Sequence, residues 1–242
     1  MISNSINIKQ PETRKSISFG WSSNDPSTHG FMTDKAARIV IANQKDKLNI
    51  LNEDNIKLLA RYADKPDEDE HCFLQDTHYY HHKTKRTIFF RKQTAMKNFL
   101  DHAAKAVEAY KNNNKQLALQ ELGRACHYLE DISQPNHVTT WNPIQAKLRK
   151  KDHFNFEKYA ANKQDFFKFE PLKNIQINYT NFTEFIKDLA ETTSKKSAPY
   201  QKTLQENKPQ NWYQVANTCI NYGQNQVATF IAAFINEVSK SE

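Results

Sequence analysis

The sequence has 242 residues, 38% of them hydrophobic and 12% aromatic, which is enough for one sizeable apolar core. Its 4 glycines and 8 prolines are too few for the many turns of an all-β domain, and its 3 cysteines cannot all pair, so no disulfide framework is predicted. The net charge of +7 favours an anionic partner, whether a phosphate ester, nucleic acid or an acidic membrane surface, and no apolar run approaches the roughly 18 residues of a transmembrane segment.

Apolar residues recur at three- and four-residue steps over most of the chain, which predicts a single all-α domain. Residues 1–20 are polar and unpatterned, so we expect a flexible leader ahead of a helical domain over residues 21–242. The expected helices are Lys35–Leu51, Asp54–Tyr62, Arg91–Asn112, Lys115–Ile132, Asn181–Thr192 and Trp212–Val238. Loops are expected over Asp67–Tyr80 and Asn136–Asp152, and a short helix is expected to begin at His153.

The helix expected at Lys115–Ile132 carries the most informative side chains. His127 and Asp131 are four residues apart, which stacks them on one face of this helix, away from its apolar stripe. Pro135 ends the helix, and His137 follows on the next loop. Two imidazoles and a carboxylate so placed suit a metal such as zinc, which binds nitrogen and oxygen donors. An exposed His–Asp pair with a nearby loop histidine explains this stretch alone equally well.

A second pair with the same spacing lies farther along the chain. His153 and Glu157 are four residues apart, so on a helix they also share one face. Together with His137 they would supply the ligands of a second metal, with one position left open for water. The alternative is an ordinary contact between two surface residues. His29, Asp64 and His78 are each uninformative alone, but all these residues follow one another in a definite order of types.

In that order, the residues resemble the pattern of the zinc-dependent bacterial phospholipase C family. The pattern begins with a tryptophan, a histidine, an aspartate at a helix end and a histidine before an aromatic residue. It continues with His-Tyr-x2-Asp and Pro-x-His and closes on His-x3-Glu. The matching residues in this sequence are Trp21, His29, Asp64, His78, His127, Asp131, Pro135, His137, His153 and Glu157. Single-strand-specific zinc nucleases have a similar frame that ends in His-x3-Asp, so Glu157 favours the phospholipase branch.

The resemblance implies an all-helical bundle that encloses a cluster of up to three zinc ions. One ion would be held by His137, His153 and Glu157. Another would be held by Asp64, His78, His127 and Asp131. The last would be held by His29, by Asp131 as a bridge, and by the amino group and carbonyl of Trp21. Asp64 is also expected to be the catalytic base, and the products would be diacylglycerol and a phosphorylated head group.

Two features depart from the family pattern. Trp21 follows the leader, so its nitrogen is a planar amide; either residues 1–20 are a propeptide that is removed, or the third site is incomplete. Where choline-preferring relatives place an acid and two aromatic residues around the head group, this sequence has Asn24, Lys65 and Gln75. These substrate-binding positions predict a head group other than choline, because a quaternary ammonium favours aromatic faces and negative charge.

Two other functions fit the same sequence. A zinc-dependent nuclease or nucleotidase would share the metal frame and could stack bases on Tyr79, Tyr80 and Trp141. A non-catalytic basic module would bind anionic lipid or nucleic acid and would have no reason to copurify with zinc. The favoured prediction is a secreted, monomeric zinc phosphodiesterase acting on phospholipid at a membrane surface, although the sequence shows no recognisable signal peptide.

Overall fold

The structure, a computed structural model, describes residues 27–44, 49–70, 77–88, 92–205 and 209–240. These residues form helices and loops without a strand among them, so the all-α fold is confirmed. The elements are α1 (Thr28–Asn43), α2 (Glu53–Ala63), α3 (Lys65–Asp69), α4 (Ala95–Lys111), α5 (Lys115–Ser133), α6 (Pro143–Lys163), the 3₁₀ turn η3 (Gln164–Phe166), α7 (Phe182–Ser197), α8 (Tyr200–Gln205) and α9 (Pro209–Ser239). The leader expected at residues 1–20 lies outside the described residues.

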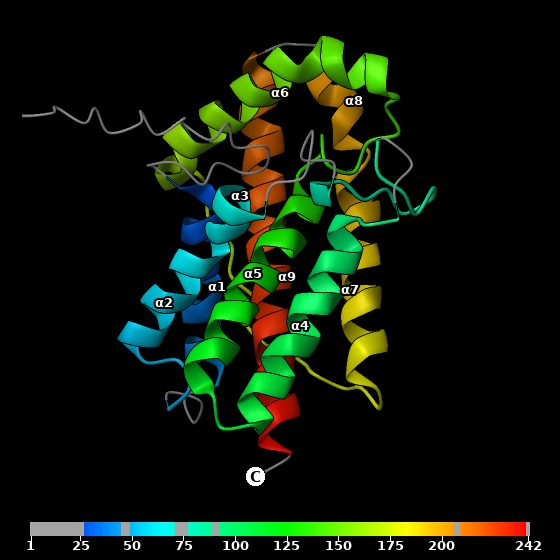
Figure 1. Ribbon diagram of the computed structural model, residues 1–242. Coiled ribbons are helices and arrows are strands. Elements are labelled where there is room, and N and C mark those ends of the chain that lie inside the picture. Colours follow the sequence, from blue (N-terminus) through cyan, green and yellow to red (C-terminus); the bar gives the residue numbers. More distant parts are fainter. Residues whose placement is uncertain (1–26, 45–48, 71–76, 89–91, 206–208, 241–242) are drawn as a thin grey trace, which may run out of the picture.

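The long helices run side by side, and α6 lies across one end of them (Figure 1). Helix α5 contacts α1, α2, α4, α7 and α9, which makes it the centre of the bundle. We call the end where α3, α6 and α8 lie the α6 end. The C-terminal turns of α5 point to the α6 end, so the residues predicted to bind metal are carried there.

The core of the bundle lies between α5 and α9. Leu122 and Leu129 of α5 are fully buried, as are Phe230 and Phe234 of α9, and the rings of Phe230 and Phe99 lie 4.8 Å apart in an edge-to-face contact. Helix α9 is therefore apolar because it fills the core. Within the described ranges, no helix is long and apolar enough to cross a membrane.

Helices α2 and α5 approach closely at Gly123. A Cβ atom on this residue would lie 2.6 Å from the carbonyl oxygen of Leu59 and 2.8 Å from Cβ of Tyr62, so any larger side chain would push the helices apart. One turn farther along α5, Nδ1 of His127 donates a hydrogen bond of 2.7 Å to the carbonyl oxygen of Ala63, the last residue of α2. The close approach therefore fixes the chain that follows α2 against His127.

Several element boundaries differ from those predicted; for example, α1 ends at Asn43 instead of Leu51, and α4 begins at Ala95 instead of Arg91. Helix α1 begins at Thr28 instead of Lys35, because the side chain of Ser27 accepts a hydrogen bond from the backbone of Gly30 and caps the helix there. The loop predicted over Asn136–Asp152 is wrong from Pro143 onward, where the structure has the first turns of α6. A reciprocal capping box between Asn142 and Gln145 starts α6 there, so His153 lies in the middle of a long helix.

A cluster of ionic hydrogen bonds attaches the segment after α3 to α4 and α5. Nδ1 of His102 lies 2.6 Å from a carboxylate oxygen of Glu121, and its Nε2 lies 3.1 Å from one of Glu70. The hydroxyl of Tyr128 donates to the same oxygen of Glu70 over 2.7 Å, and Arg124 also pairs with Glu70. Burial opposes the charge of Glu70, but His102 and its other partners lower the pKa of Glu70 to about 2.

His102 is expected to stabilise the fold in a pH-dependent way. Burial lowers the pKa of His102, but the hydrogen bonds to Glu121 and Glu70 outweigh burial and raise its pKa above 6.5. The stabilisation is therefore complete below pH 6.5 and is lost as the pH rises through the raised pKa. His102→Gln should lower the free energy of unfolding by about 2–3 kcal/mol near pH 6, because the carboxylates lose their cation. Urea unfolding of both proteins from pH 6 to pH 9 tests this, and a difference that does not shrink with rising pH contradicts it.

Candidate metal centre

The last two turns of α5 hold the His–Asp pair that the sequence singled out. His127 and Asp131 are both fully buried, so the interpretation of an exposed surface pair is wrong. Nε2 of His127 lies 3.2 Å from a carboxylate oxygen of Asp131, one helical turn away. After Pro135 the chain turns back, and this places Nδ1 of His137 3.2 Å from the other oxygen of Asp131. Asp131 thus stands between the two histidines.

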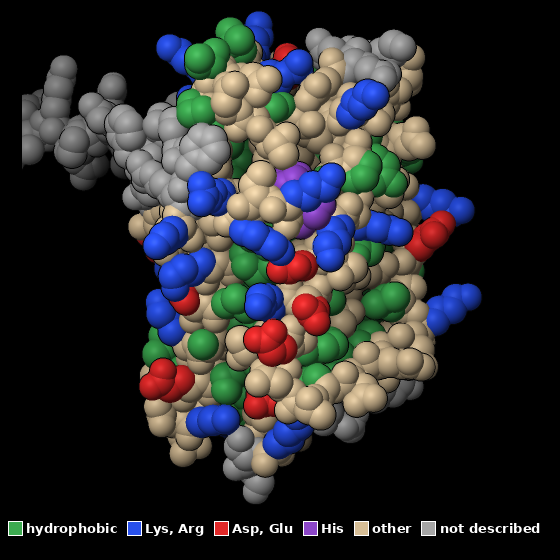
Figure 2. All heavy atoms as spheres, turned by 90° about the vertical axis from the view of Figure 1, so that its right-hand side faces the viewer, with side chains coloured by type: hydrophobic (Ala, Val, Ile, Leu, Met, Phe, Trp, Pro, Cys, Tyr) green, Lys and Arg blue, Asp and Glu red, His purple; other side chains and the backbone are tan. Residues whose placement is uncertain are grey.

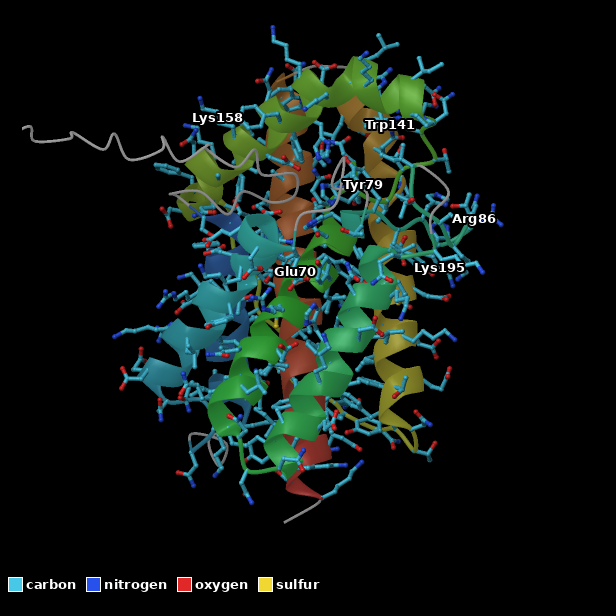
Figure 3. The ribbon with its side chains drawn as sticks, in the orientation of Figure 1. Glu70, Tyr79, Arg86, Trp141, Lys158 and Lys195 are labelled. Atoms are coloured by element: carbon cyan, nitrogen blue, oxygen red, sulfur yellow. The ribbon has the colours of Figure 1, made fainter. Side chains whose placement is uncertain are left out.

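His137, His153 and Glu157 form one group of donors. Nε2 of His137 lies 3.1 Å from Nε2 of His153 and 3.4 Å from a carboxylate oxygen of Glu157, and the same oxygen lies 2.5 Å from Nε2 of His153. Nδ1 of His137 donates to the carbonyl oxygen of His78 over 3.0 Å, and Nδ1 of His153 lies 3.3 Å from the hydroxyl of Tyr79. Tyr79 is labelled in Figure 3. With Nδ1 so engaged, the lone pair of each Nε2 points into the group.

His78, His127 and Asp131 form a second group. Nδ1 of His78 lies 2.8 Å from a carboxylate oxygen of Asp131 and 3.0 Å from Nε2 of His127. His127 uses its Nδ1–H for the carbonyl oxygen of Ala63, so its Nε2 faces the group as an acceptor.

His29, Asp67 and His127 form a third group, which shares His127 with the second. Oδ1 of Asp67 lies 3.8 Å from Nδ1 of His78 and 3.9 Å from Nε2 of His127. Nε2 of His29 lies 3.8 Å from a carboxylate oxygen of Asp131, and its ring stacks on His127 with centroids 4.0 Å apart. Trp21, the other ligand predicted here, lies outside the described residues.

Asp64 lies beside these groups, at the end of α2. Its Oδ1 accepts hydrogen bonds from the backbone N–H of Gly30, over 3.1 Å, and from the hydroxyl of Ser27. Burial raises the pKa of Asp64 to about 6. Lys65, a predicted substrate-binding residue, forms an ion pair with Glu68. The other two predicted substrate-binding residues, Asn24 and Gln75, lie outside the described residues.

The imidazoles and Asp131 control one another's charge. Burial opposes the charge of Asp131, but His127, His137 and His78 outweigh it and hold its pKa well below 3.8. Burial also lowers the pKa values of the histidines, yet the Asp131 charge raises that of His127 to about 9 and that of His137 to about 10. The pKa of His29 stays well below 6.5, chiefly because of burial. Any cation bound among these groups would compete with protons for the same nitrogen atoms.

The three donor groups fit zinc. Each supplies imidazole nitrogen and carboxylate oxygen, and the donor atoms of a group lie within 4.8 Å of one another. Zinc–ligand distances of roughly 2.0–2.2 Å place two ligands of a tetrahedral ion about 3.3–3.6 Å apart, close to the spacings in these groups. Moreover, Nε2 of His29 is buried and has no hydrogen-bond partner among the described residues. A bound metal ion would satisfy this nitrogen atom.

The sequence did not reveal Asp67 and Glu130. Asp67 was hidden by its place in an acidic run that was expected to be a loop, whereas the short helix α3 turns it toward His78 and His127. Glu130 is fully buried, and one of its oxygens lies 2.7 Å from Nδ1 of His29 while the other accepts from the hydroxyl of Thr33 over 2.7 Å. An acid next to Asp131 on a helix otherwise looks like a surface residue. Its carboxylate fixes the imidazole of His29 with Nε2 directed at Asp131.

Glu130→Gln is expected to weaken the zinc ion on His29 while leaving the fold intact. Burial raises the pKa of Glu130 well above its usual range, and a zinc ion on His29 would favour the ionised carboxylate. Glutamine keeps the shape but cannot ionise to support the Nδ1–H of His29, and such a change typically weakens metal binding by about 10–100-fold. The test uses chains that begin at Trp21, so that the amino group expected to complete the site on His29 is present. Competition with a chromophoric chelator should show one zinc ion released at lower chelator concentration from the variant than from the same chain without the substitution. Thr33→Val, which removes only the hydroxyl, should have a smaller effect in the same direction. Release of zinc at wild-type chelator concentrations would limit Glu130 to a packing role.

Comparisons with known proteins agree with this geometry. The sequence model of a family described as zinc dependent phospholipase C matches residues 28–200, from α1 to the start of α8. The alpha toxin from Clostridium absonum has a similar fold, with a TM-score of 0.77 and 20% identity over 91% of this chain and 67% of that chain. The alpha-toxin of Clostridium perfringens, from avian strain SWCP, gives a TM-score of 0.76 and 18% identity over 93% and 67% of the two chains. No curated protein sequence matches.

Proposed function

Because this chain belongs to the zinc-dependent phospholipase C family, we propose that it hydrolyses phospholipids between glycerol and phosphate. The products are diacylglycerol and a phosphorylated head group. The observation that carries the proposal is the set of buried donor groups around Asp131 at the α6 end, all of them within the family match.

The residues divide into zinc ligands and a base. His137, His153 and Glu157 would hold one ion, and His78, His127, Asp131 and Asp67 would hold a second. His29 and Asp131 would hold a third together with Trp21. Zinc, when bound, acts as a Lewis acid that neutralises charge on the phosphate oxygens and makes water more acidic.

Asp64 receives the proton of the attacking water. Its pKa of about 6, raised by burial, leaves it ionised at neutral pH yet basic enough to accept a proton. The backbone N–H of Gly30 and the hydroxyl of Ser27 hold Oδ1, which orients the carboxylate. The water oxygen bonds to phosphorus as its proton passes to Asp64, and the bond from phosphorus to the glycerol oxygen breaks. The glycerol oxygen takes a proton from solvent water, and Asp64 releases its proton to solvent.

Hydrolysis assays decide between the proposal and its alternatives. Release of diacylglycerol from phosphatidylcholine, phosphatidylethanolamine and phosphatidylinositol, lost with a chelator and restored by zinc, is the expected result. A low rate on phosphatidylcholine relative to the others is expected from Asn24, Lys65 and Gln75. Cleavage of single-stranded DNA without any hydrolysis of phospholipid would instead identify a nuclease. A protein that neither reacts nor retains zinc would be a binding module.

The structure gives the nuclease alternative little support. The rings expected to stack on bases, Tyr79, Tyr80 and Trp141, are all buried. Tyr79 stacks on His137, with ring centroids 4.7 Å apart, and its hydroxyl contacts His153. Its ring is therefore used to position two zinc ligands.

Removal of residues 1–20 is expected to complete the third zinc site. In the full chain the nitrogen of Trp21 is an amide, whereas a chain beginning at Trp21 has an α-amino group whose pKa of about 7.7–8.0 lets zinc displace its proton. The shorter chain should therefore bind one more zinc ion and hydrolyse phospholipid faster. Elemental analysis and initial rates of the two chains test this, and equal values for both would show that Trp21 is not a ligand.

We further propose that the mature protein is a secreted monomer. Its presence in the culture supernatant would test secretion, and light scattering of that protein would test the oligomeric state.

A further inference from the structure

Helix α6 has two different faces. Its inner face supplies His153 and Glu157 to the metal centre and packs Phe156 and Ala160 into a small apolar cluster near α9. Its outer face exposes Ile144 and Leu148, whose side chains are 71% and 78% accessible. These two residues are one helical turn apart, so they lie side by side on the surface. Large apolar side chains exposed together in this way typically mark a docking site.

The same outer face is basic. At about 100° per residue, Lys147, Lys151 and Lys158 share the side of α6 that carries Ile144 and Leu148. All three lysines are exposed, and Lys158 is labelled in Figure 3. The acids of α6 lie elsewhere, because Glu157 is buried in the metal centre and Asp152 is turned about 80° from Ile144. We call the set Ile144, Lys147, Leu148, Lys151 and Lys158 the α6 outer face.

The surface near the α6 outer face is also mainly basic. In Figure 2, basic side chains predominate in the upper half of the molecule, toward the α6 end, and most of the acidic ones lie below. Arg86 and Lys195, labelled in Figure 3, belong to this basic region. A lipid membrane with anionic head groups has a flat, negatively charged surface and an apolar interior. It is therefore complementary to both the lysines and the two apolar side chains.

We infer that the α6 outer face docks on the surface of an anionic lipid membrane. Ile144 and Leu148 enter the boundary between head groups and acyl chains, and Lys147, Lys151 and Lys158 bind the negatively charged head groups. The metal ligands lie on the opposite side of the same helix, within about one helix diameter of 10–12 Å from the lipid. A small cavity of about 10 Å³ beside α6 is lined by Arg149, Asp152 and His153, so His153 lies close to this flank of the helix. Docking thus serves the proposed function, although it requires no catalysis.

Binding to vesicles that cannot be hydrolysed separates docking from catalysis. Digalactosyldiacylglycerol gives a neutral surface and sulfoquinovosyldiacylglycerol an anionic one, and neither contains phosphate. We expect the zinc-loaded full chain to cosediment with vesicles that contain the sulfolipid and to be released by salt. Lys147→Gln with Lys151→Gln should reduce the partition coefficient by about fivefold for each lysine. Ile144→Gln with Leu148→Gln should reduce it by about tenfold or more, and glutamine maintains the helix.

A matched variant and a soluble substrate distinguish lost docking from a damaged fold. Leu117→Gln, which alters an exposed leucine at the opposite end of α5, should leave vesicle binding unchanged. All variants should hydrolyse a short-chain phosphatidylethanolamine below its critical micelle concentration at the wild-type rate. Wild-type vesicle binding in both α6 variants, or an equal loss in Leu117→Gln, would overturn the inference. So would tight binding of single-stranded DNA that needs the lysines while vesicles are not bound. Absence of hydrolysis with normal vesicle binding would count against the proposed function alone.

Discussion

Asp131→Asn is expected to remove at least one zinc ion and to reduce kcat/KM on phospholipid by about 10³-fold or more. The carboxylate lies 2.8 Å from His78, 3.2 Å from His127 and His137, and 3.8 Å from His29, so it reaches members of all three donor groups. Asparagine keeps the volume but removes the negative charge that these imidazoles and a zinc ion would share.

The loss of zinc should also lower stability, because the free energy of metal binding to the native protein adds to the free energy of folding. Elemental analysis and thermal unfolding of the same sample test both effects. Asp101→Asn is the matched control, since Asp101 is an exposed acid on α4 that pairs with Lys97. A variant at position 131 that retains wild-type zinc content and melting temperature would show that the buried Asp131 is structural.

Asp64→Asn and Asp67→Asn are expected to fail in different ways. Asp64→Asn should keep its zinc and its fold, because the amide oxygen still accepts from Gly30 and Ser27, but it should lose about 10²–10⁴-fold in kcat with the loss of the base. Asp67→Asn should lose zinc, because its Oδ1 lies among the nitrogen donors of His78 and His127.

Zinc content and kcat must be measured on each variant in the same preparation. The opposite pattern, with zinc lost from Asp64→Asn and retained in Asp67→Asn, would restore Asp64 as the ligand that the family resemblance implies. Equal zinc and near-normal turnover in Asp64→Asn would remove Asp64 from the chemistry.

The sequence predicted the elements whose side chains divide cleanly into a buried and an exposed face. Helix α5 was predicted to within one residue because its leucines recur at helical steps, and its His–Asp spacing directed attention to the right end of the bundle. The first half of helix α6 was not predicted, because its apolar residues Ile144 and Leu148 are exposed and do not follow the usual pattern of a buried apolar face. Its start was still visible in Asn142, Pro143 and Gln145, which cap the helix.

The metal centre was predicted by the order of its ligands along the chain rather than by their geometry. Sequence spacing relates His127 to Asp131 within one helix, but only the folded bundle brings His29 of α1 beside them. Glu130 could not be predicted, because its burial depends on the packing of α1 against α5. Asp67 depends likewise on the turn of α3 after α2.

The two faces of α6 make zinc and membrane thermodynamically linked. A zinc ion bound by His153 and Glu157 would hold the inner face of α6 in place, and the proposed membrane contact needs the outer face of the same helix to be ordered. If each ligand favours the same position of α6, then linkage requires zinc to raise membrane affinity and the membrane to raise zinc affinity by an equal factor. Zinc should therefore leave more slowly to a chelator when galactolipid vesicles with sulfolipid are present, and an unchanged release rate would argue against the coupling. In medium poor in zinc, such a protein would leave the lipid surface as it loses its metal.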